Sequence, residues 1–133
     1  MNIAWIAGFF DGEGCVYIFP NGKGIQVSIT QKNKASLELI KAFYGFGRIA
    51  YKDKNNQCHI WQVCSKIDIL RFLRSIRQYV IVKKIDVEIG IIYAQTLDSK
   101  RHGYYRLDEQ ILNKRISLRK SLRCGERYQG KGE

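Results

Sequence analysis

The sequence contains few of the residues that build several common kinds of functional site. Among its 133 residues there are two histidines and four cysteines, and no two cysteines have the C-x-x-C spacing, so we expect no zinc site. No Ser-His-acid arrangement can be recognised, and Gly22-Lys23-Gly24 is a turn that is too short for a phosphate-binding loop. We expect the cysteines to be free thiols in a reducing compartment, and we expect no small-molecule substrate.

Long hydrophobic runs are also absent. The apolar stretch near the N-terminus is too short to span a membrane and is interrupted by acids. It also lacks the basic start of a signal peptide. We therefore expect a soluble, intracellular protein with no membrane partner.

Acidic residues are scarce relative to basic ones. There are 12 Asp and Glu residues against 23 Lys and Arg residues, which gives a formal net charge of +11. A domain this basic is typical of a polyanion binder, most often of nucleic acid, and a merely cationic surface is the alternative. The chain is 45% hydrophobic and long enough for one domain with a core, which we expect at residues 1–122, followed by a flexible tail at 123–133.

The N-terminal region predicts a helix that ends in acids. Residues 2–10 are expected to be helical, and Gly12 and Gly14 are expected to break the helix. Asp11 and Glu13 then stand at a helix C-terminus, where carboxylates are unfavourable. A bound cation is the simplest reason for such a pair.

Hydrophobic periodicity predicts an α+β fold. Strands are expected at 15–19, 25–30, 48–52 and 58–63, and further helices at 34–44, 65–77, 82–97 and 108–122. The order αββαββα indicates a four-stranded antiparallel sheet backed by helices. Side chains expected to pack inside include Leu37, Ile40, Phe43, Ile49, Tyr51, Trp61, Val63, Ile85, Ile89, Ile92 and Tyr93.

The segment from Ile6 to Gly14, which reads IAGFFDGEG, resembles the signature of the LAGLIDADG homing endonucleases, with Glu in place of the second Asp. The resemblance continues in VSITQK, which ends at Lys32, and in YVIVKK, which ends at Lys84. Altogether it covers roughly residues 3–95, and no motif can be matched after Thr96.

The resemblance implies a divalent-metal nuclease site. Glu13 matches the metal-binding acid of the family, Gly12 offers its backbone carbonyl as a ligand, and Asp11 supports the turn. Gln31 matches a residue that helps to position water, and Lys83 a basic residue near the scissile phosphate. The implied cofactor is Mg²⁺, for which Mn²⁺ can substitute, whereas Ca²⁺ is expected to bind without supporting cleavage.

One family position departs from the pattern. The family often has a further basic residue about four positions after the glutamine, and this chain has Ala35 there. Lys32 and Lys34 are the two alternatives for its role.

A single motif implies a homodimer in this family. The motif helices pack on each other at the two-fold axis, and the small residues Ala4, Ala7 and Gly8 fit such an interface. The dimer is expected to bind a long pseudo-palindromic site on double-stranded DNA with the outer face of a saddle-like sheet. The candidate DNA-contacting residues are Tyr17, Lys23, Gln26, Ser28, Thr30, Lys32, Arg48, Lys52 and Gln62.

The function that the resemblance implies is a Mg²⁺-dependent, site-specific homing endonuclease. It cuts both strands across the minor groove, leaves short 3′ overhangs and supports the mobility of an intron or intein, in an organelle (chloroplast or mitochondrion) or a prokaryotic cytoplasm. The alternatives are an RNA-binding intron maturase, a non-cleaving DNA-binding regulator on the same scaffold, and a basic adaptor whose helix 2–10 merely dimerises. The joint presence of Glu13, Gln31 and Lys83 favours the nuclease.

Overall fold

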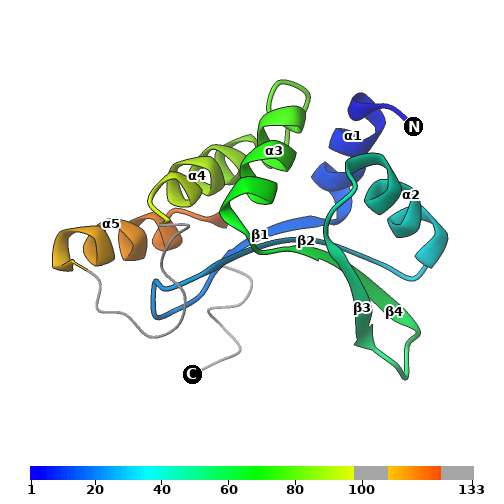
Figure 1. Ribbon diagram of the computed structural model, residues 1–133, viewed down its shortest axis with the longest axis horizontal. Coiled ribbons are helices and arrows are strands. Elements are labelled where there is room, and N and C mark those ends of the chain that lie inside the picture. Colours follow the sequence, from blue (N-terminus) through cyan, green and yellow to red (C-terminus); the bar gives the residue numbers. More distant parts are fainter. Residues whose placement is uncertain (98–107, 124–133) are drawn as a thin grey trace.

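A computed structural model describes residues 1–97 and 108–123 and shows a four-stranded sheet with helices packed on one face (Figure 1). The elements, in chain order, are α1 (Ile3–Glu13), β1 (Gly14–Ile18), β2 (Ile25–Gln31), α2 (Lys34–Tyr44), β3 (Arg48–Asp53), β4 (Cys58–Val63), α3 (Lys66–Ile76), α4 (Lys84–Gln95) and α5 (Glu109–Lys120). This confirms the α+β class and the αββαββα order, which two further helices follow. None of the helices in these two ranges has the length and apolar character that a membrane crossing requires.

The sheet has the strand order β1-β2-β4-β3, and all neighbouring strands are antiparallel. The alternation predicted for the second strand is present, because Ile25, Val27 and Ile29 are buried. Trp61 pairs with Ile29 on one side and Ile49 on the other, and it is fully buried at the centre of the core. The helix-covered face of the sheet therefore carries the hydrophobic core.

The first helix is longer than the sequence predicts. It runs through Gly12 to Glu13, and its start is capped by the Asn2 side chain, which accepts the Trp5 N–H at 2.8 Å. Only Gly14 leaves the helix, and a Cβ there would lie 2.1 Å from the Phe10 ring. Gly14 is thus required for close packing, whereas Gly12 stays in the last helical turn.

Two aromatic residues predicted to be buried are exposed. Phe43 is 43% exposed on α2, and the next residue, Tyr44, packs against the core instead. Tyr51 is 57% exposed on β3, although Ile49 on the same strand packs against the core. Tyr51 is exposed because the β3–β4 hairpin extends beyond the helices, so the far end of the hairpin has no helix to pack against (Figure 1).

The buried face of α4 also differs from the prediction. Ile89 and Tyr93 are buried, as expected, but Ile85 is 55% and Ile92 38% exposed. Val87, Gly90, Ile91 and Ala94 line the buried side instead. The helix itself carries apolar residues on most of its sides, so hydrophobic periodicity alone does not define which side is buried. Of the predicted tail, residues 124–133 lie outside the described residues.

Candidate active site and nucleic-acid interface

The carboxylate of Asp11 joins the end of α1 to the segment that enters α4. Its Oδ2 accepts the backbone N–H of Ile81 at 2.7 Å, and its Oδ1 accepts the backbone N–H of Lys83 at 3.0 Å. Lys83 is the N-cap of α4 and provides no side-chain cap of its own. Both oxygens of Asp11 are therefore engaged in holding two distant segments together.

Lys83 lies at the same helix end. Its Nζ donates to the backbone carbonyl oxygen of Asp11 at 2.6 Å. The last carbonyls of a helix have no partner within the helix and carry partial negative charge, so an ammonium group there is favourable. The structure thus brings Lys83 next to the acid-ended helix, although Lys83 and Asp11 are 72 positions apart in the sequence.

Glu13 is the last residue of α1 and is exposed. Within residues 1–97 and 108–123, its carboxylate has no hydrogen-bond or ion-pair partner. Gly12, one residue earlier, is also exposed in the final helical turn. The end of α1 therefore offers one free carboxylate and nearby backbone carbonyls, while the Asp11 carboxylate is occupied.

This donor set is small for a metal site. No cluster of three or more His, Cys, Asp or Glu side chains able to hold a metal occurs among the described residues. One carboxylate and a backbone carbonyl fit Mg²⁺, which retains several waters and completes its shell with phosphate oxygens. The described residues at the end of α1 thus offer one carboxylate and backbone carbonyls as possible ligands.

Gln31 ends β2 beside the same helix terminus. Gly14, the first residue of β1, pairs with Ile29, so Gln31 lies two residues beyond that pair, on the side where α1 ends. Its Oε1 accepts the backbone N–H of Lys32 at 2.9 Å. Across the sheet Gln31 pairs with His59, whose buried Nδ1 has no hydrogen-bond partner among the described residues.

The exposed side of α1 carries a row of small residues beside Trp5, with one difference from the prediction. Ala4, Gly8 and Gly12 recur every four residues and are all exposed. Ala7, predicted to share this side, is fully buried and packs in the core of this chain instead. A Cβ added at Gly8 or Gly12 would meet no atom within 4 Å, so nothing in the described chain requires glycine at either position.

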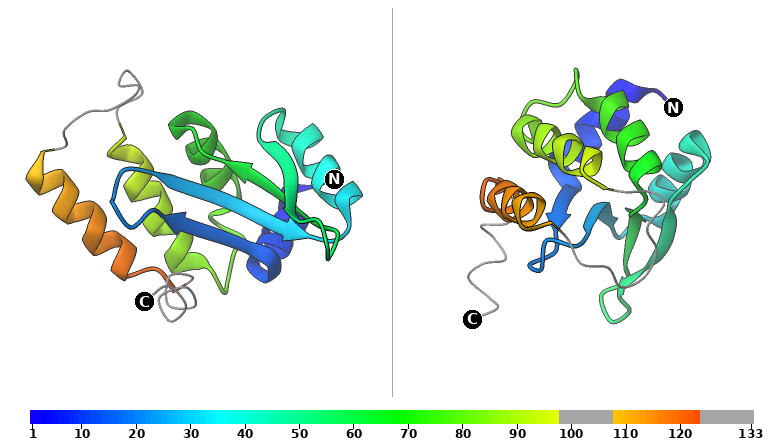
Figure 2. Two further views of the ribbon diagram at one scale, coloured as in Figure 1. Left: turned by 90° about the horizontal axis from the view of Figure 1, so that it is seen from below. Right: turned by 60° about the vertical axis from the view of Figure 1, so that its left-hand side comes forward.

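The sheet face opposite the helices carries mainly polar side chains, although Ser28 among the predicted contact residues is only 6% exposed. The register places Tyr17 opposite Gln26 on β1 and β2, and Gln62 on β4 between Ser28 and Arg48. Seen from below, the strands lie in front of the helices, with no described helix over them (Figure 2).

The other predicted contact residues lie on or beside this face. Thr30 pairs with Ile60 on β4. Lys52 stands at the irregularity in β3 between Tyr51 and Asp53, and Lys23 and Lys32 are exposed at the two ends of β2. The predicted residues thus lie on or beside one face of the sheet.

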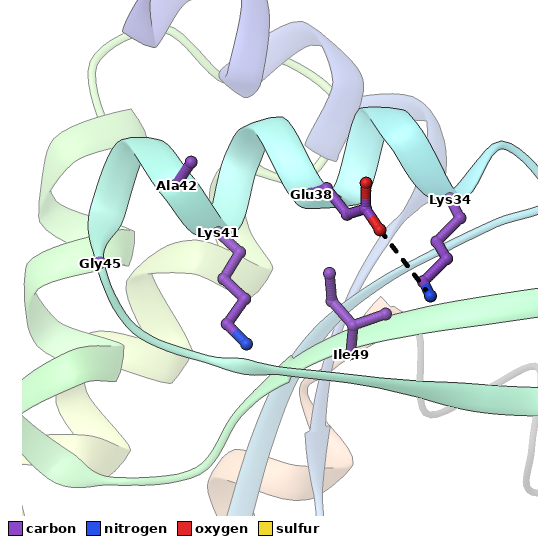
Figure 3. A pocket seen from close by; sticks show the side chains of 6 residues that line it. All are labelled: Lys34, Glu38, Lys41, Ala42, Gly45 and Ile49. Atoms are coloured by element: carbon purple, nitrogen blue, oxygen red, sulfur yellow. Dashed lines mark ion pairs between the residues drawn. The ribbon is translucent and has the colours of Figure 1, made fainter.

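A pocket of about 540 Å³ lies between α2 and β3 and is separate from this face (Figure 3). Lys34 and Glu38 line it and form an ion pair at 3.7 Å, with more than half of each side chain exposed. Lys32 and Lys34 are the two alternatives for the basic residue that the family has at the position of Ala35. The side chain of Lys34 is directed along α2 toward Glu38, whereas Lys32 directly follows Gln31.

Comparison with known proteins identifies one matching family and several solved structures with the same fold. The family described as "LAGLIDADG-like domain" matches residues 1–77, which include the segments with Glu13 and Gln31. No curated protein sequence matches the chain.

Several solved structures have the same fold. The LAGLIDADG meganuclease I-AabMI, bound to uncleaved DNA, superimposes with a TM-score of 0.79 at 25% identity, over 94% of this chain and 46% of its own. The archaeal intron-encoded homing endonuclease I-Vdi141I, complexed with DNA, gives 0.64 at 24% identity, over 89% of this chain and 94% of its own. The homing endonuclease I-CvuI, with its target in 2 mM Ca, gives 0.70 at 18% identity, over 89% of this chain and 77% of its own. The chain thus spans about half the length of I-AabMI and nearly all of I-Vdi141I.

Proposed function

The chain belongs to the LAGLIDADG-like domain family, and from this premise we propose that it is a homodimeric, site-specific DNA endonuclease that depends on a divalent metal. I-CvuI has been crystallised with DNA in the presence of Mg and of Ca, which is consistent with divalent metal use. The observation that carries the proposal is the Glu13 carboxylate, which has no partner among the described residues and ends a helix with Ala4, Gly8 and Gly12 on its exposed side.

A second copy completes the site. Two α1 helices packed through Ala4, Gly8 and Gly12 bring two Glu13 carboxylates and two helix C-termini close to one axis. These groups repel one another, so divalent cations and the DNA phosphates that they bind become the favourable occupants. Trp5, which is 44% exposed and stacks on Phe9 at 5.0 Å, adds apolar area beside the small residues.

The remaining residues have supporting roles. Glu13 and the carbonyl of Gly12 hold the metal, which when bound activates water and stabilises charge on the phosphate and the leaving oxygen. Asp11 fixes the helix end, and Gln31 positions water beside it. Lys83 places a positive charge at the scissile phosphate, close to the carbonyl that it contacts in the free protein. We assign the role vacant at Ala35 to Lys32.

The outer sheet face reads the DNA. Gln26 and Gln62 suit adenine and Arg48 suits guanine in the major groove, with Tyr17, Ser28 and Thr30 beside them and Lys23, Lys32 and Lys52 in contact with phosphates. The dimer binds a long pseudo-palindromic site, cuts across the minor groove and leaves short 3′ overhangs. Its biological role is the mobility of an intron or intein, in an organelle or a prokaryotic cell.

The test uses a library of randomised DNA duplexes incubated with the purified protein. With Mg²⁺ or Mn²⁺ we expect double-strand cuts at one pseudo-palindromic sequence with short 3′ overhangs, and with Ca²⁺ we expect binding without cuts. If this sequence is bound but not cut with Mg²⁺, the regulator is supported instead. If only structured RNA is bound, the maturase is supported, and if no nucleic acid is bound, the adaptor is supported.

A further inference from the structure

Arg115 is an unusual residue of α5, because it is an arginine that is only 1% exposed. Arginine is almost never fully buried unless it is paired. No carboxylate of the described residues forms an ion pair with it. Its partners are instead backbone and hydroxyl oxygens, and these come from two other parts of the fold.

The first partner is the end of α4. Nε of Arg115 donates to the hydroxyl of Thr96 at 2.9 Å, and Nη2 donates to the carbonyl oxygen of Thr96 at 2.8 Å. Thr96 is the C-cap of α4, so the guanidinium lies where a helix favours positive charge. This interaction ties α5 to α4.

The second partner is the β1–β2 turn. Nη1 of Arg115 donates to the carbonyl oxygen of Gly22 at 3.2 Å, and the hydroxyl of Tyr93 donates to the same oxygen at 2.6 Å. The guanidinium carbon also lies 5.1 Å from the centre of the Tyr93 ring. One turn later on α5, Nε of Arg119 donates to the carbonyl oxygen of Ile18, at the end of β1, at 3.0 Å.

The turn has hydrogen bonds of its own, from the Phe19 N–H to the Gly24 carbonyl oxygen at 3.0 Å and from the Gly22 N–H to the Phe19 carbonyl oxygen at 2.9 Å, and it also packs against α5. Gly22 has a φ of +70°, and a Cβ there would lie 2.9 Å from the side chain of Leu112 on α5. Helix α5 lies beside this turn, as Figure 2 shows. The turn is therefore fitted closely against α5 and bonded to it by the buried arginine.

The β1–β2 turn lies at the end of the sheet away from the proposed cutting site. β2 runs from Ile25 at the turn to Gln31 beside the end of α1. Six residue steps along a strand span about 20 Å, which corresponds to about six base pairs along DNA. In the proposed dimer the turn therefore faces the outer base pairs of each half-site, where Tyr17, Lys23 and Gln26 lie.

We propose that Arg115 is a positioning residue that fixes the β1–β2 turn and thereby sets base discrimination at the outer ends of the DNA site. The inference rests on the proposed function, because it assigns a specificity role within the same DNA interface. Arg115 touches no DNA in this account. It acts through Gly22, whose position determines where the side chains of the neighbouring strand ends meet the base edges.

The experiment compares wild-type protein with Arg115→Lys and Tyr93→Phe in the randomised-duplex cleavage selection. Lysine keeps the charge but lacks the planar fork that holds several oxygens at once, and Tyr93→Phe removes one bond to Gly22 and keeps the ring. Lys114→Met, on the exposed side of α5, is the matched control that removes a charge from the same helix. Amide hydrogen exchange on the DNA-free proteins reports on the turn independently of cleavage.

We expect both substitutions to speed exchange of the amides in residues 19–24 and to leave those of β4 unchanged. We expect discrimination between bases to fall about tenfold at the outer positions, within the range that one good base contact supplies, and to change less than about twofold near the cuts. Lys114→Met is expected to behave as the wild type. Tyr93→Phe keeps the test open if Arg115→Lys does not fold.

Other outcomes overturn the proposal. A loss of cleavage that is equal at all positions, as general destabilisation produces, contradicts it. So does faster exchange in the turn with unchanged outer discrimination. If the wild-type protein cuts no duplex, the proposed nuclease function fails and the specificity role fails with it, whereas the exchange experiment still shows whether Arg115 fixes the turn.

Discussion

Substitution of Gly8 by alanine separates what the chain needs for folding from what it needs for association. A glycine within a helix costs about 1 kcal/mol relative to alanine, and a Cβ at Gly8 would meet no atom of the described residues within 4 Å. Gly8→Ala is therefore expected to stabilise the isolated chain by about 0.5–1 kcal/mol. No described residue requires glycine at this position.

In the proposed dimer the same methyl group is inserted between two closely packed helices. Overpacking of this kind costs about 1–3 kcal/mol, which raises the dimer dissociation constant roughly 5- to 150-fold. Sedimentation equilibrium measures association, and urea unfolding at concentrations far below the dissociation constant measures the stability of the chain. Ser117→Ala on the exposed side of α5 is the control, because it raises helix propensity away from the proposed interface. If Gly8→Ala associates as tightly as the wild type, the exposed side of α1 is not the interface.

Three further outcomes are expected. Asp11→Ala leaves the amides of Ile81 and Lys83 without their acceptor and should destabilise the fold by about 1–2 kcal/mol in urea unfolding; an unchanged stability contradicts the bridging role. Burial raises the pKa of Tyr44 in the folded protein, despite its hydrogen bond to Ser75. The free energy of unfolding should therefore fall as the pH rises above the pKa of tyrosine in the unfolded chain, about 10. Tyr44→Phe should lack this loss when unfolding is measured from pH 8 to pH 11. Arg48→Gln should shift the preferred base at one position of each half-site from guanine toward adenine, and a cleavage selection with no such shift removes Arg48 from base readout.

The strands could be predicted because their patterns are local, whereas α1 ends at Glu13, three residues later than the sequence predicts. The alternation of Ile25, Val27 and Ile29 defined the buried face of β2, and all three are buried. The priority of Glu13 over Asp11 also agrees with the geometry. Two backbone amides engage the Asp11 carboxylate, whereas that of Glu13 has no partner among the described residues. The metal ligation itself stays a prediction.

The errors arise where burial depends on neighbours that the sequence does not place. Tyr51 has the alternation of a buried strand residue, but its hairpin extends past the helices. Ala7 was assigned to a partner because small residues share a helical face, yet this chain's own core covers it.

Arg115 was missed altogether, because a charged residue in a polar helix reads as solvent-exposed. Its guanidinium can be buried because it donates hydrogen bonds to oxygens of Thr96 and Gly22, which are 19 and 93 residues away in the sequence. No local pattern brings these groups together.

The most direct measurement of the central claim compares DNA cleavage and DNA binding for Glu13→Gln, with Glu109→Gln as the control for loss of an exposed acid. Glutamine keeps the size of the side chain and removes the charge that holds the metal. We expect Glu13→Gln to bind the selected duplex about as tightly as the wild type and to lose cleavage in Mg²⁺ by at least about a thousandfold, on the order of 4 kcal/mol of transition-state stabilisation. We expect Glu109→Gln to retain both properties. Cleavage by Glu13→Gln at the wild-type rate would contradict the account.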